Sequence, residues 1–336
     1  MTTAVVILNF NGRTLLQKFL PSVIQYSGDA RIIVVDNGSA DSSSKLLADQ
    51  FSQIECIQID TNLGFCGGYN FALKQVKADR YVLLNSDVEV TPDWLLPLAA
   101  VLDRNPSIAA VQPKILSHRS RNQFEYAGAA GGMIDSLGYP FCRGRIFFHQ
   151  EHDEGQYNDD REIFWSSGAC MMIQSKLFHE LGGFDEDFFA HMEEIDLCWR
   201  LQRAGHKIYY TGASTVFHVG GGTLSSSNPR KTYLNFRNGL SLLYKNLPME
   251  ELLIKFPVRL VLDWIAATKF ALSGSPRDGL AVMKAHFHFF WYWKKERSRR
   301  LRASRHDFLK PSNRYAGFIV WDFFILGKRK VTQLNS

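Results

Sequence analysis

Residues 31–41 read Arg-Ile-Ile-Val-Val-Asp-Asn-Gly-Ser-Ala-Asp, an apolar run that stops abruptly at polar turn residues. A short, nearly continuous apolar run is typical of a strand buried on both faces of a parallel sheet. We therefore predict a buried strand over Arg31–Val35 that ends at Asp36. Ligands of open parallel sheets bind beyond the carboxyl ends of the strands, so the polar residues that follow are candidates for a binding site.

On both sides of this run the chain alternates between apolar runs and segments with apolar residues at helical spacing. Further strands are predicted over Ala4–Leu8, Ile54–Ile59, Tyr81–Leu84 and Ala109–Ile115. Helices are predicted over Leu15–Ile24, Ser42–Phe51, Tyr69–Val76 and Trp94–Leu102, and Pro21 is expected to kink or shorten the first of them. This alternation predicts an α/β fold with a mainly parallel sheet flanked by helices.

Polar clusters follow four of the predicted strands. They are Asn9, Asn11 and Gly12; Asp36, Asn37 and Gly38; Asn62, Gly64, Gly68 and Asn70; and Asn85, Ser86 and Asp87. Each cluster alone can be explained by the residues that turns commonly use. Four clusters that follow strands of one sheet would meet in one crevice at its edge, which favours a binding site. The sequence has neither a Gly-x-x-x-x-Gly-Lys-Ser/Thr loop nor, after its first strand, a Gly-x-Gly-x-x-Gly turn. Asp36 suits a ribose or base, and Asp87 suits a divalent cation that bridges phosphates.

These clusters and several later motifs match one known family. The motifs are Asp36-Asn37-Gly38-Ser39-x-Asp41, Asn62-x-Gly64-Phe65-x-x-Gly68-x-Asn70, Asn85-Ser86-Asp87, Trp165-Ser166-Ser167-Gly168-Ala169, Gly182-Gly183-Phe184-Asp185-Glu186 and Met192-Glu193-Glu194-Ile195-Asp196-Leu197. Over about residues 3–245 the chain resembles family 2 glycosyltransferases with the GT-A fold. The subgroup most similar in appearance is the rhamnosyltransferase-like enzymes of bacterial surface-polysaccharide assembly.

The resemblance implies inverting transfer of a hexosyl or rhamnosyl group from a nucleotide-diphospho-sugar to a hydroxyl of a glycan or lipid-linked acceptor. It implies that the donor is bound by Asn9, Asn11, Asp36, Asn37, Asn62, Gly64, Gly68, Asn70, Asn85, Ser86, Asp87 and Arg237. It implies acceptor contacts for Trp165, Glu193 and Asp196, and Mg²⁺ or Mn²⁺ ligands in Asp87 and His218. The family's metal motif often reads Asp-x-Asp, and Asn85 takes its first position here.

The resemblance also names Glu194 as the catalytic base, at a position where the family usually has Asp. Inverting transfer is one displacement at the anomeric carbon, and a base must accept the proton of the acceptor hydroxyl. The leaving diphosphate gains charge that a metal or hydrogen-bond donors stabilise. A structural alternative stays open, because acidic residues at a helix start are favoured by the helix dipole and Asp196–Arg200 is a helical i,i+4 pair. Arg237 could equally lie on a solvated helix face.

The predicted organisation has a catalytic domain over 1–245 and an extension over 246–336. The catalytic domain divides into a nucleotide-sugar half over about 1–115 and an acceptor half over 116–245. Gly131–Gln156 is Gly-rich and then charged, which indicates a loop or hairpin over the site. The extension is predicted to be helical and basic.

The charge of the extension indicates an anionic partner. Residues 251–336 carry 17 Lys and Arg against 6 Asp and Glu, whereas residues 1–250 carry 22 against 27. We name Phe287–Arg305 the basic aromatic segment, because six aromatic residues precede seven cations within it. Aromatic residues beside cations fit an interfacial helix on an anionic membrane. A solvated basic helix packed on the body is the alternative, and nucleic acid is disfavoured because no nucleic-acid-binding motif accompanies the charges.

Location follows from what the sequence lacks. Four charged residues interrupt the apolar stretch Leu252–Leu272, which argues against a membrane-spanning helix. The N-terminus has no basic region of the kind that begins a signal peptide. The five cysteines include no Cys-x-x-Cys pair, which fits a reducing compartment. We expect a cytoplasmic protein that lies peripherally on the inner face of the membrane.

Two other functions remain compatible with such a sheet. A nucleotidyltransferase that makes nucleotide sugars would need a basic triphosphate-binding loop near the first strand, and this region offers only Arg13. A protein that binds nucleotide sugars without catalysis would keep the sheet and leave Glu194 idle.

Overall fold

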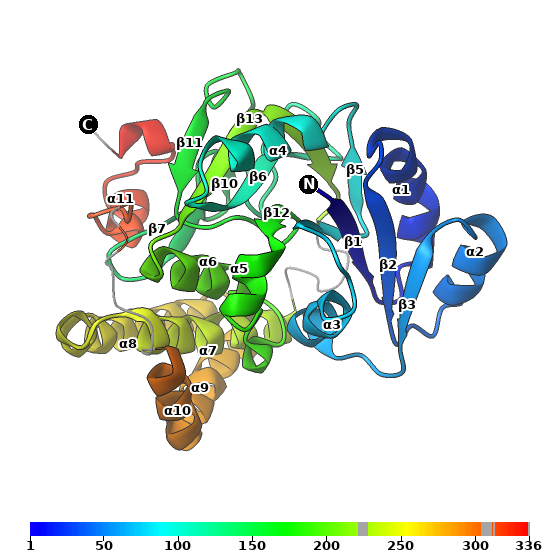
Figure 1. The fold of residues 1–336 in the computed structure, drawn as a ribbon. Coiled ribbons are helices and arrows are strands. Elements are labelled where there is room, and N and C mark those ends of the chain that lie inside the picture. Colours follow the sequence, from blue (N-terminus) through cyan, green and yellow to red (C-terminus); the bar gives the residue numbers. More distant parts are fainter. Residues whose placement is uncertain (221–227, 304–310, 312, 335–336) are drawn as a thin grey trace.

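The computed structural model describes residues 1–220, 228–303, 311 and 313–334. Its centre is a nine-stranded sheet in the order β11-β13-β6-β12-β4-β1-β2-β3, with β5 paired to β13 (Figure 1). The strands are β1 (Thr3–Asn9), β2 (Arg31–Asn37), β3 (Glu55–Ile59), β4 (Arg80–Asn85), β5 (Val88–Val90), β6 (Ile108–Ser117), β11 (Asp160–Ile163), β12 (Cys170–Gln174) and β13 (Lys207–His218). The predicted α/β class with a mainly parallel sheet is confirmed.

The parallel part of the sheet carries the N-terminal half. β1 pairs in parallel with β2 and β4, and β2 pairs in parallel with β3. β12 enters between β4 and β6 and runs antiparallel to both. This insertion places a strand from the second half of the chain beside the central strands, so both halves contribute to one sheet.

Two hydrophobic cores cover the two faces of this sheet. Along β1, Ala4 and Val6 pack into one core, while Val5 and Ile7 pack into the other. The first core includes residues of α3 (Gly64–Leu73), α5 (Ser175–Glu180) and α6 (Glu193–Arg203), and the second includes α1 (Arg13–Tyr26), α2 (Ser43–Gln50) and α4 (Leu95–Arg104). Burial on both faces explains why these strands have unbroken apolar runs.

Two predicted helix boundaries differ from the structure. α1 continues past Pro21 to Tyr26, so the expected shortening is wrong. Leu16, Phe19, Leu20 and Val23 are all buried along it, and this packing offsets the hydrogen bond that proline removes. α3 begins at Gly64, ahead of the predicted start at Tyr69, because the Asn62 side chain accepts a hydrogen bond from the Gly64 backbone N–H at 2.8 Å.

The segment predicted as a loop or hairpin forms a small antiparallel sheet in the order β10-β9-β8-β7. Its strands are β7 (Gly132–Ile134), β8 (Pro140–Cys142), β9 (Arg145–Ile146) and β10 (His149–Gln150). Near the end of the chain, α11 (Ile319–Phe324) returns to pack Ile319 and Phe323 against Phe141 and Ile146. The extension therefore covers this sheet from outside (Figure 1).

The remaining helices lie together below the central sheet in the view of Figure 1. They are α7 (Pro229–Asn246), α8 (Met249–Leu272), α9 (Pro276–Trp291) and α10 (Trp293–Ala303), and two single 3-10 turns lie at Glu186–Phe188 and Val331–Gln333. α7 packs against α6 of the catalytic part and against α9 of the extension. In the part of the chain that the structure describes, no helix combines the length and the apolar composition needed to cross a bilayer.

Candidate active site

The polar clusters predicted from the sequence meet at the carboxyl edge of the parallel strands. Strand register sets Asn9 beside Asp36, and Leu8 beside Asn85. The Ser39 hydroxyl accepts hydrogen bonds from Asn9 Nδ2 at 3.2 Å and from the Asn11 backbone N–H at 2.9 Å. Among the described residues, the buried Asn9 Oδ1 has no hydrogen-bond partner. This edge therefore keeps an acceptor free for a ligand.

A second part of the edge is built on Asn37. Its side-chain NH₂ donates to Asn62 Oδ1 at 3.1 Å and to the Gly64 carbonyl at 3.0 Å, and its Oδ1 accepts from the Leu63 backbone N–H. Asp36 is buried beside it and accepts from the Ser39 backbone N–H at 3.3 Å and from the Ser44 hydroxyl. Asn37 thus fixes the turn that starts α3, and Asp36 fixes the loop after β2.

Gly68 and Asn70 have packing roles in the structure. A Cβ on Gly68 would lie 2.7 Å from Leu8 Cδ1, so this glycine allows α3 to approach β1. Asn70 exchanges two hydrogen bonds with the backbone of Phe184, at 2.8 and 2.9 Å, and donates to Glu186 Oε1 at 3.0 Å. These contacts join α3 to the loop before α6. Donor contacts for both residues remain predictions.

Asp87 lies directly against His218. β5 pairs antiparallel with β13, and Val88 is opposite His218. Asp87, which directly precedes Val88, therefore lies next to His218 at the end of this strand pair. His218 Nε2 lies 3.0 Å from Asp87 Oδ1, and Nδ1 lies 3.2 Å from Glu125 Oε2. Asn85 Nδ2 is 3.4 Å from the same Nε2. All three titratable side chains are buried.

The charges of this cluster depend on one another. Burial favours the neutral imidazole, but hydrogen bonds and charges from Asp87 and Glu125 outweigh it and raise the pKa of His218 to about 10. Burial alone would raise the pKa of Asp87, but its contacts with His218 lower that pKa below the ordinary value. The same balance lowers the pKa of Glu125. A divalent cation would take the place of the shared proton on the imidazole.

Asp87 and His218 suit a metal ion that is completed by a substrate. Within the described ranges, no three His, Cys, Asp or Glu side chains are arranged to hold a metal by themselves. Mg²⁺ commonly uses one or two carboxylates plus substrate phosphates. Asp87 Oδ1 and His218 Nε2 lie 3.0 Å apart as a buried ion pair. These two residues would hold such an ion together with the substrate phosphates.

The loop before α6 places the acidic motif beside the Asn62–Gly64 turn. Phe189, His191 and Met192 all have positive φ angles, which are costly for residues other than glycine. The Phe189 carbonyl accepts from the Phe65 backbone N–H at 2.9 Å. A Cβ on Gly64, whose φ is +73°, would lie 2.6 Å from the Phe189 ring. The start of α6 is thereby fixed against the Asn62–Gly64 turn.

Asn238 holds this strained loop from α7. Its side-chain NH₂ donates to the carbonyls of Phe188, Ala190 and His191 at 3.1, 2.9 and 2.7 Å. Arg237 Nη2 donates to the carbonyls of Asp187 and Phe188 at 2.7 and 3.1 Å. Arg237 is therefore used in the loop, and its predicted contact with the donor diphosphate remains a prediction.

Glu193 and Glu194 begin α6 with raised pKa values. Burial, only partly offset by backbone N–H groups, raises the pKa of Glu194 to about 7. Burial and the charge of Glu194 raise the pKa of Glu193 well above its ordinary value. The Oε2 atoms of both residues are shielded from solvent and have no hydrogen-bond partner within the described part of the chain. A carboxylate that titrates near neutral pH is suited to accept a proton.

Asp196 and Trp165, both predicted to contact the acceptor, lie in the interior. Asp196 is completely buried and receives Lys245 Nζ, Arg200 Nε and Asn246 Nδ2 at 2.8, 2.8 and 2.9 Å. Trp165 is 4% exposed and donates its indole N–H to the Met133 carbonyl at 2.8 Å. The structural alternative for Asp196 as an ion pair with Arg200 is what the geometry shows.

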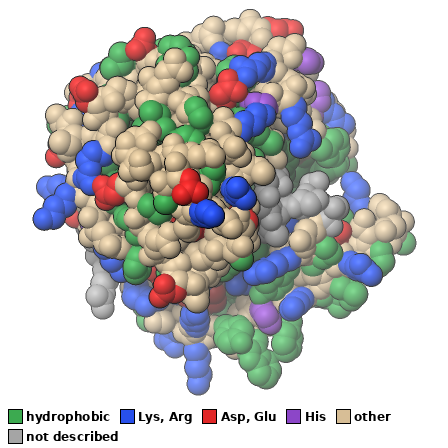
Figure 2. All heavy atoms as spheres, turned by 90° about the vertical axis from the view of Figure 1, so that its right-hand side faces the viewer, with side chains coloured by type: hydrophobic (Ala, Val, Ile, Leu, Met, Phe, Trp, Pro, Cys, Tyr) green, Lys and Arg blue, Asp and Glu red, His purple; other side chains and the backbone are tan. Residues whose placement is uncertain are grey.

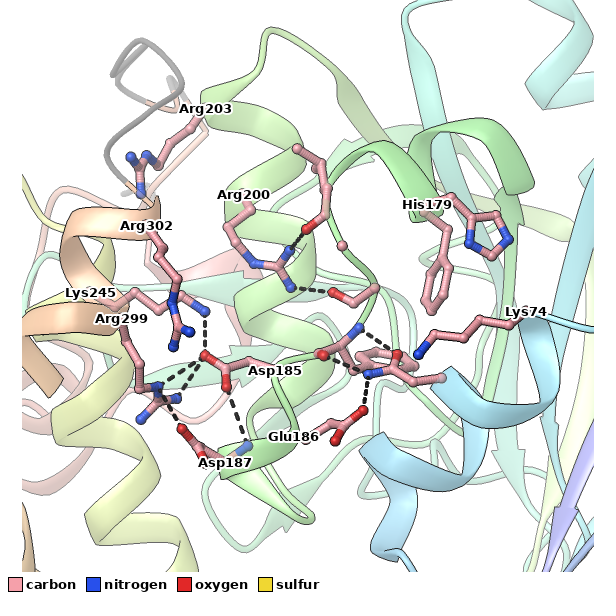
Figure 3. Close-up of a pocket in the computed structure, with 16 residues that line it drawn as sticks. Lys74, His179, Asp185, Glu186, Asp187, Arg200, Arg203, Lys245, Arg299 and Arg302 are labelled. Atoms are coloured by element: carbon pink, nitrogen blue, oxygen red, sulfur yellow. Dashed lines mark hydrogen bonds and ion pairs between the residues drawn. The ribbon is translucent and has the colours of Figure 1, made fainter. Parts of the chain in front are cut away.

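A cavity of about 540 Å³ lies beside this ion-pair network, where α3, α5, α6 and α10 approach one another (Figure 3). Figure 3 shows Asp185 between Lys245 and Arg299, which it contacts at 2.7 and 3.0 Å. Burial opposes ionisation of Asp185, but these cations hold its pKa well below the ordinary range. The cations of this cavity therefore join the extension to the catalytic part.

Sequence reasoning missed Glu125 and Lys245. Glu125 lies between β6 and β7, outside the regular elements, and it reaches His218 only through the fold. Lys245 lies on α7, and its partners Asp185 and Asp196 are 60 and 49 residues away in the chain. No local pattern marks either residue.

Comparison with known proteins gives a consistent family. The model of Glycosyl transferase family 2 matches residues 4–182. An N-acetylglucosaminyl-diphospho-decaprenol L-rhamnosyltransferase of Mycobacterium tuberculosis is 27% identical over 222 residues, which cover 60% of this chain and 71% of that protein. Rhamnosyltransferase WbbL of Escherichia coli is 24% identical over 221 residues, which cover 64% and 82%.

The fold likeness extends further than the sequence likeness. The crystal structure of GalNAc-T7 with UDP, GalNAc and Mn²⁺ superimposes with a TM-score of 0.57 at 16% identity. The match covers 97% of this chain and 56% of that one. The predicted GT-A fold is therefore confirmed.

Proposed function

This chain belongs to glycosyl transferase family 2, and we propose that it catalyses inverting transfer of a hexosyl or rhamnosyl group from a nucleotide-diphospho-sugar. The acceptor is a hydroxyl of a glycan or of a lipid-linked saccharide in surface-polysaccharide biosynthesis. The relatives from M. tuberculosis and E. coli support rhamnosyl transfer as the reaction class.

The observation that carries the proposal is the environment of Glu194. Its carboxylate has a pKa of about 7, an unpartnered Oε2, and a position next to the loop that contacts the donor-side turn. In the proposed mechanism this oxygen accepts the proton of the acceptor hydroxyl while the hydroxyl oxygen attacks the anomeric carbon and the bond from that carbon to the diphosphate oxygen breaks. Asn238 and Arg237 hold the preceding loop and so position the base.

The donor lies along the edge formed by Asn9, Asn11, Asp36, Asn37 and Asn62, with Asn85 and Ser86 beside the diphosphate. Asp87 and His218 would hold Mg²⁺ or Mn²⁺, which would supply positive charge to the leaving diphosphate. Support comes from the direct contact of these two buried side chains at the end of the Asn85–Asp87 motif and from the Mn²⁺ and UDP of the GalNAc-T7 structure.

In this proposal the extension holds the enzyme at the membrane that contains its lipid-linked acceptor. We assign catalysis to residues 1–245 and membrane association to 246–336, with the protein peripheral on the inner face of the cytoplasmic membrane. The M. tuberculosis relative is named for a diphospho-decaprenol substrate, which supports a lipid-linked acceptor. Arg299 and Arg300 of the basic aromatic segment are buried in contacts with Asp185 and the Tyr244 carbonyl, so only part of that segment is free for lipid.

A panel of nucleotide sugars tests the function. With Mn²⁺ and a lipid-linked saccharide acceptor, we expect release of nucleoside diphosphate that depends on one donor and on the acceptor. Release of pyrophosphate from a nucleoside triphosphate and a sugar phosphate would instead identify a nucleotidyltransferase. Donor binding without turnover of any acceptor would identify a non-catalytic binding protein.

A further inference from the structure

Helix α8 turns a charged pair inward and leaves an apolar stripe exposed. Arg259 and Asp263 are 4% and 0% exposed, whereas Val261 and Ile265 on the opposite side are 59% and 58% exposed. The exposed stripe continues through Ile254, Val258 and Leu272 at helical spacing. A helix on a water-soluble body normally turns its apolar stripe to the core. α8 instead buries the charged pair Arg259 and Asp263 together with Leu252, Phe256 and Ala267, and it leaves a second apolar stripe exposed.

The inward polar side is locked in place. Arg259 Nε donates to Asp263 Oδ1 at 2.8 Å, and His286 Nε2 of α9 lies 3.3 Å from Asp263 Oδ2. The Arg259 guanidinium lies 3.8 Å from the centre of the Tyr139 ring, in the small sheet. Rotating α8 to bury its apolar stripe would break this buried pair, which is strongly unfavourable. The apolar stripe is therefore held outside by the fold.

The exposed stripe continues onto α11. Lys269 Nζ lies 4.5 Å from the centre of the Phe324 ring, so the two helices are neighbours. Ile319 and Phe323 anchor α11 in a core, while its other side is exposed. The α8–α11 face consists of Ile254, Val258, Val261, Trp264, Ile265, Leu272, Trp321, Phe324, Ile325 and Leu326, each at least 43% exposed. Exposed apolar residues gathered on two neighbouring helices are typical of an interaction surface.

The exposed charges of the helices that carry this face are mostly positive. Among the described residues of 249–334, Glu250 at the start of α8 is the one exposed carboxylate; Asp263, Glu296 and Asp322 are buried, and Glu251 and Asp278 are partly buried. Exposed cations in the same region include Lys269, Arg277, Lys294, Arg297 and Arg302. Figure 2 views the molecule from the side opposite α8 and α11, and it shows hydrophobic side chains interspersed with Lys and Arg along the lower edge. This distribution complements anionic lipid headgroups.

We propose that the α8–α11 face docks on a bilayer that contains anionic lipids, with α8 lying in the plane of the headgroup and acyl boundary. Trp264 and Trp321 suit that depth, because indole rings favour the interface. α8 has 24 residues, so it is about 36 Å long and lies along the surface without spanning. A second copy of the chain is a poorer occupant, since the same face on two copies would bring like charges together. The inference deepens the proposed function, because a lipid-linked acceptor lies in the same bilayer.

Vesicle binding tests the face without any transfer assay. We expect the full chain to sediment with phosphatidylcholine–phosphatidylglycerol vesicles far more than with pure phosphatidylcholine vesicles. Ile265→Gln should lower the partition coefficient about tenfold, and a variant that adds Ile254→Gln and Val261→Gln should fall to background. Leu96→Gln is the matched control, because Leu96 is a 65% exposed residue of α4 outside this face. Binding of Ile265→Gln equal to that of the parent would overturn the proposal.

Tryptophan quenching locates the contact. Lipids brominated on the acyl chain should quench the parent, and the Trp264→Phe/Trp321→Phe variant should lose most of this quenching. The Trp291→Phe/Trp293→Phe variant should keep it, and the opposite result would assign docking to the basic aromatic segment. Absence of vesicle binding together with a dimer that Ile265→Gln dissociates would assign the face to a second copy. The vesicle-binding and quenching results do not depend on the transfer assay. Membrane docking and glycosyl transfer can therefore each be disproved without the other.

Discussion

His218 Nε2 lies 3.0 Å from Asp87 Oδ1, and a strand pairing sets this separation. Val88 of β5 is opposite His218 of β13, so the carboxylate that follows β4 meets an imidazole 131 positions later in the chain. Glu125 contacts the other ring nitrogen and orients the imidazole. Asp87 from the first half of the chain and His218 from the second half thus form one polar pair at the edge of the sheet.

Asp87→Ala should abolish metal-dependent binding of the nucleoside diphosphate and nearly abolish turnover. The change removes the only carboxylate of the Asn85–Asp87 motif and leaves His218 paired with Glu125 alone. Calorimetric titration of UDP, dTDP and GDP with and without Mn²⁺ measures the loss. Glu89→Gln is the control, since Glu89 lies on the same strand pair but contacts Arg121 and His118. Unchanged metal-dependent affinity in Asp87→Ala would remove Asp87 from the metal site.

Glu194→Gln should fold and bind donor normally while transfer falls about 10²–10⁴-fold. The amide keeps the size of the side chain and removes the proton acceptor. Glu193→Gln is the matched comparison, because the two residues are neighbours at the start of α6. An active Glu194→Gln beside an inactive Glu193→Gln would transfer the role to Glu193. Activity in both variants would remove general-base catalysis from the mechanism.

The pH dependence of transfer should follow Glu194. A base must be unprotonated, so kcat should rise with pH through about 7, where burial has placed the pKa of Glu194. Stability should change in the opposite direction. A raised folded-state pKa means that the folded protein holds the proton more tightly, so the free energy of unfolding falls as pH rises from the ordinary value of 4.5 to about 7. Urea unfolding of Glu194→Gln across this range should show a weaker fall than the parent.

Asn238→Ala should lower kcat and leave donor affinity close to that of the parent. The variant removes three hydrogen bonds from the strained loop before Glu193 and does not touch the Asn9–Asp36 edge. The stranded buried carbonyls should cost about 1–3 kcal/mol of stability. Asn235→Ala, three residues earlier on α7, controls for the loss of a polar side chain from that helix. A lowered donor affinity with unchanged kcat would show that Asn238 acts on the donor edge instead.

The sequence by itself determined β1, β2, β3, β4 and β6 and the polar residues that follow β1, β2 and β4. Apolar runs such as Ile32–Val35 are sufficient because a strand buried on both faces has no polar position, and the following Asp36 and Asn37 mark where the strand leaves the core. The motifs between Asp36 and Leu197 were sufficient to predict the glycosyltransferase family and the GT-A fold. Boundaries were less accurate at α1 and α3, where packing around Pro21 and the hydrogen bond from the Gly64 N–H to Asn62 influence the ends.

The tertiary structure decided which side of each element faces which neighbour. Periodicity predicts that Arg259 and Asp263 of α8 share one side and that Val261 and Ile265 share the other, but it cannot say which side turns inward. Contacts with Tyr139 and His286, from distant parts of the chain, turned the charged side inward. Glu125 reached His218 in the same way, through pairings that no local pattern encodes. Local sequence sets the chemistry of each segment, and long-range packing sets the direction in which that chemistry points.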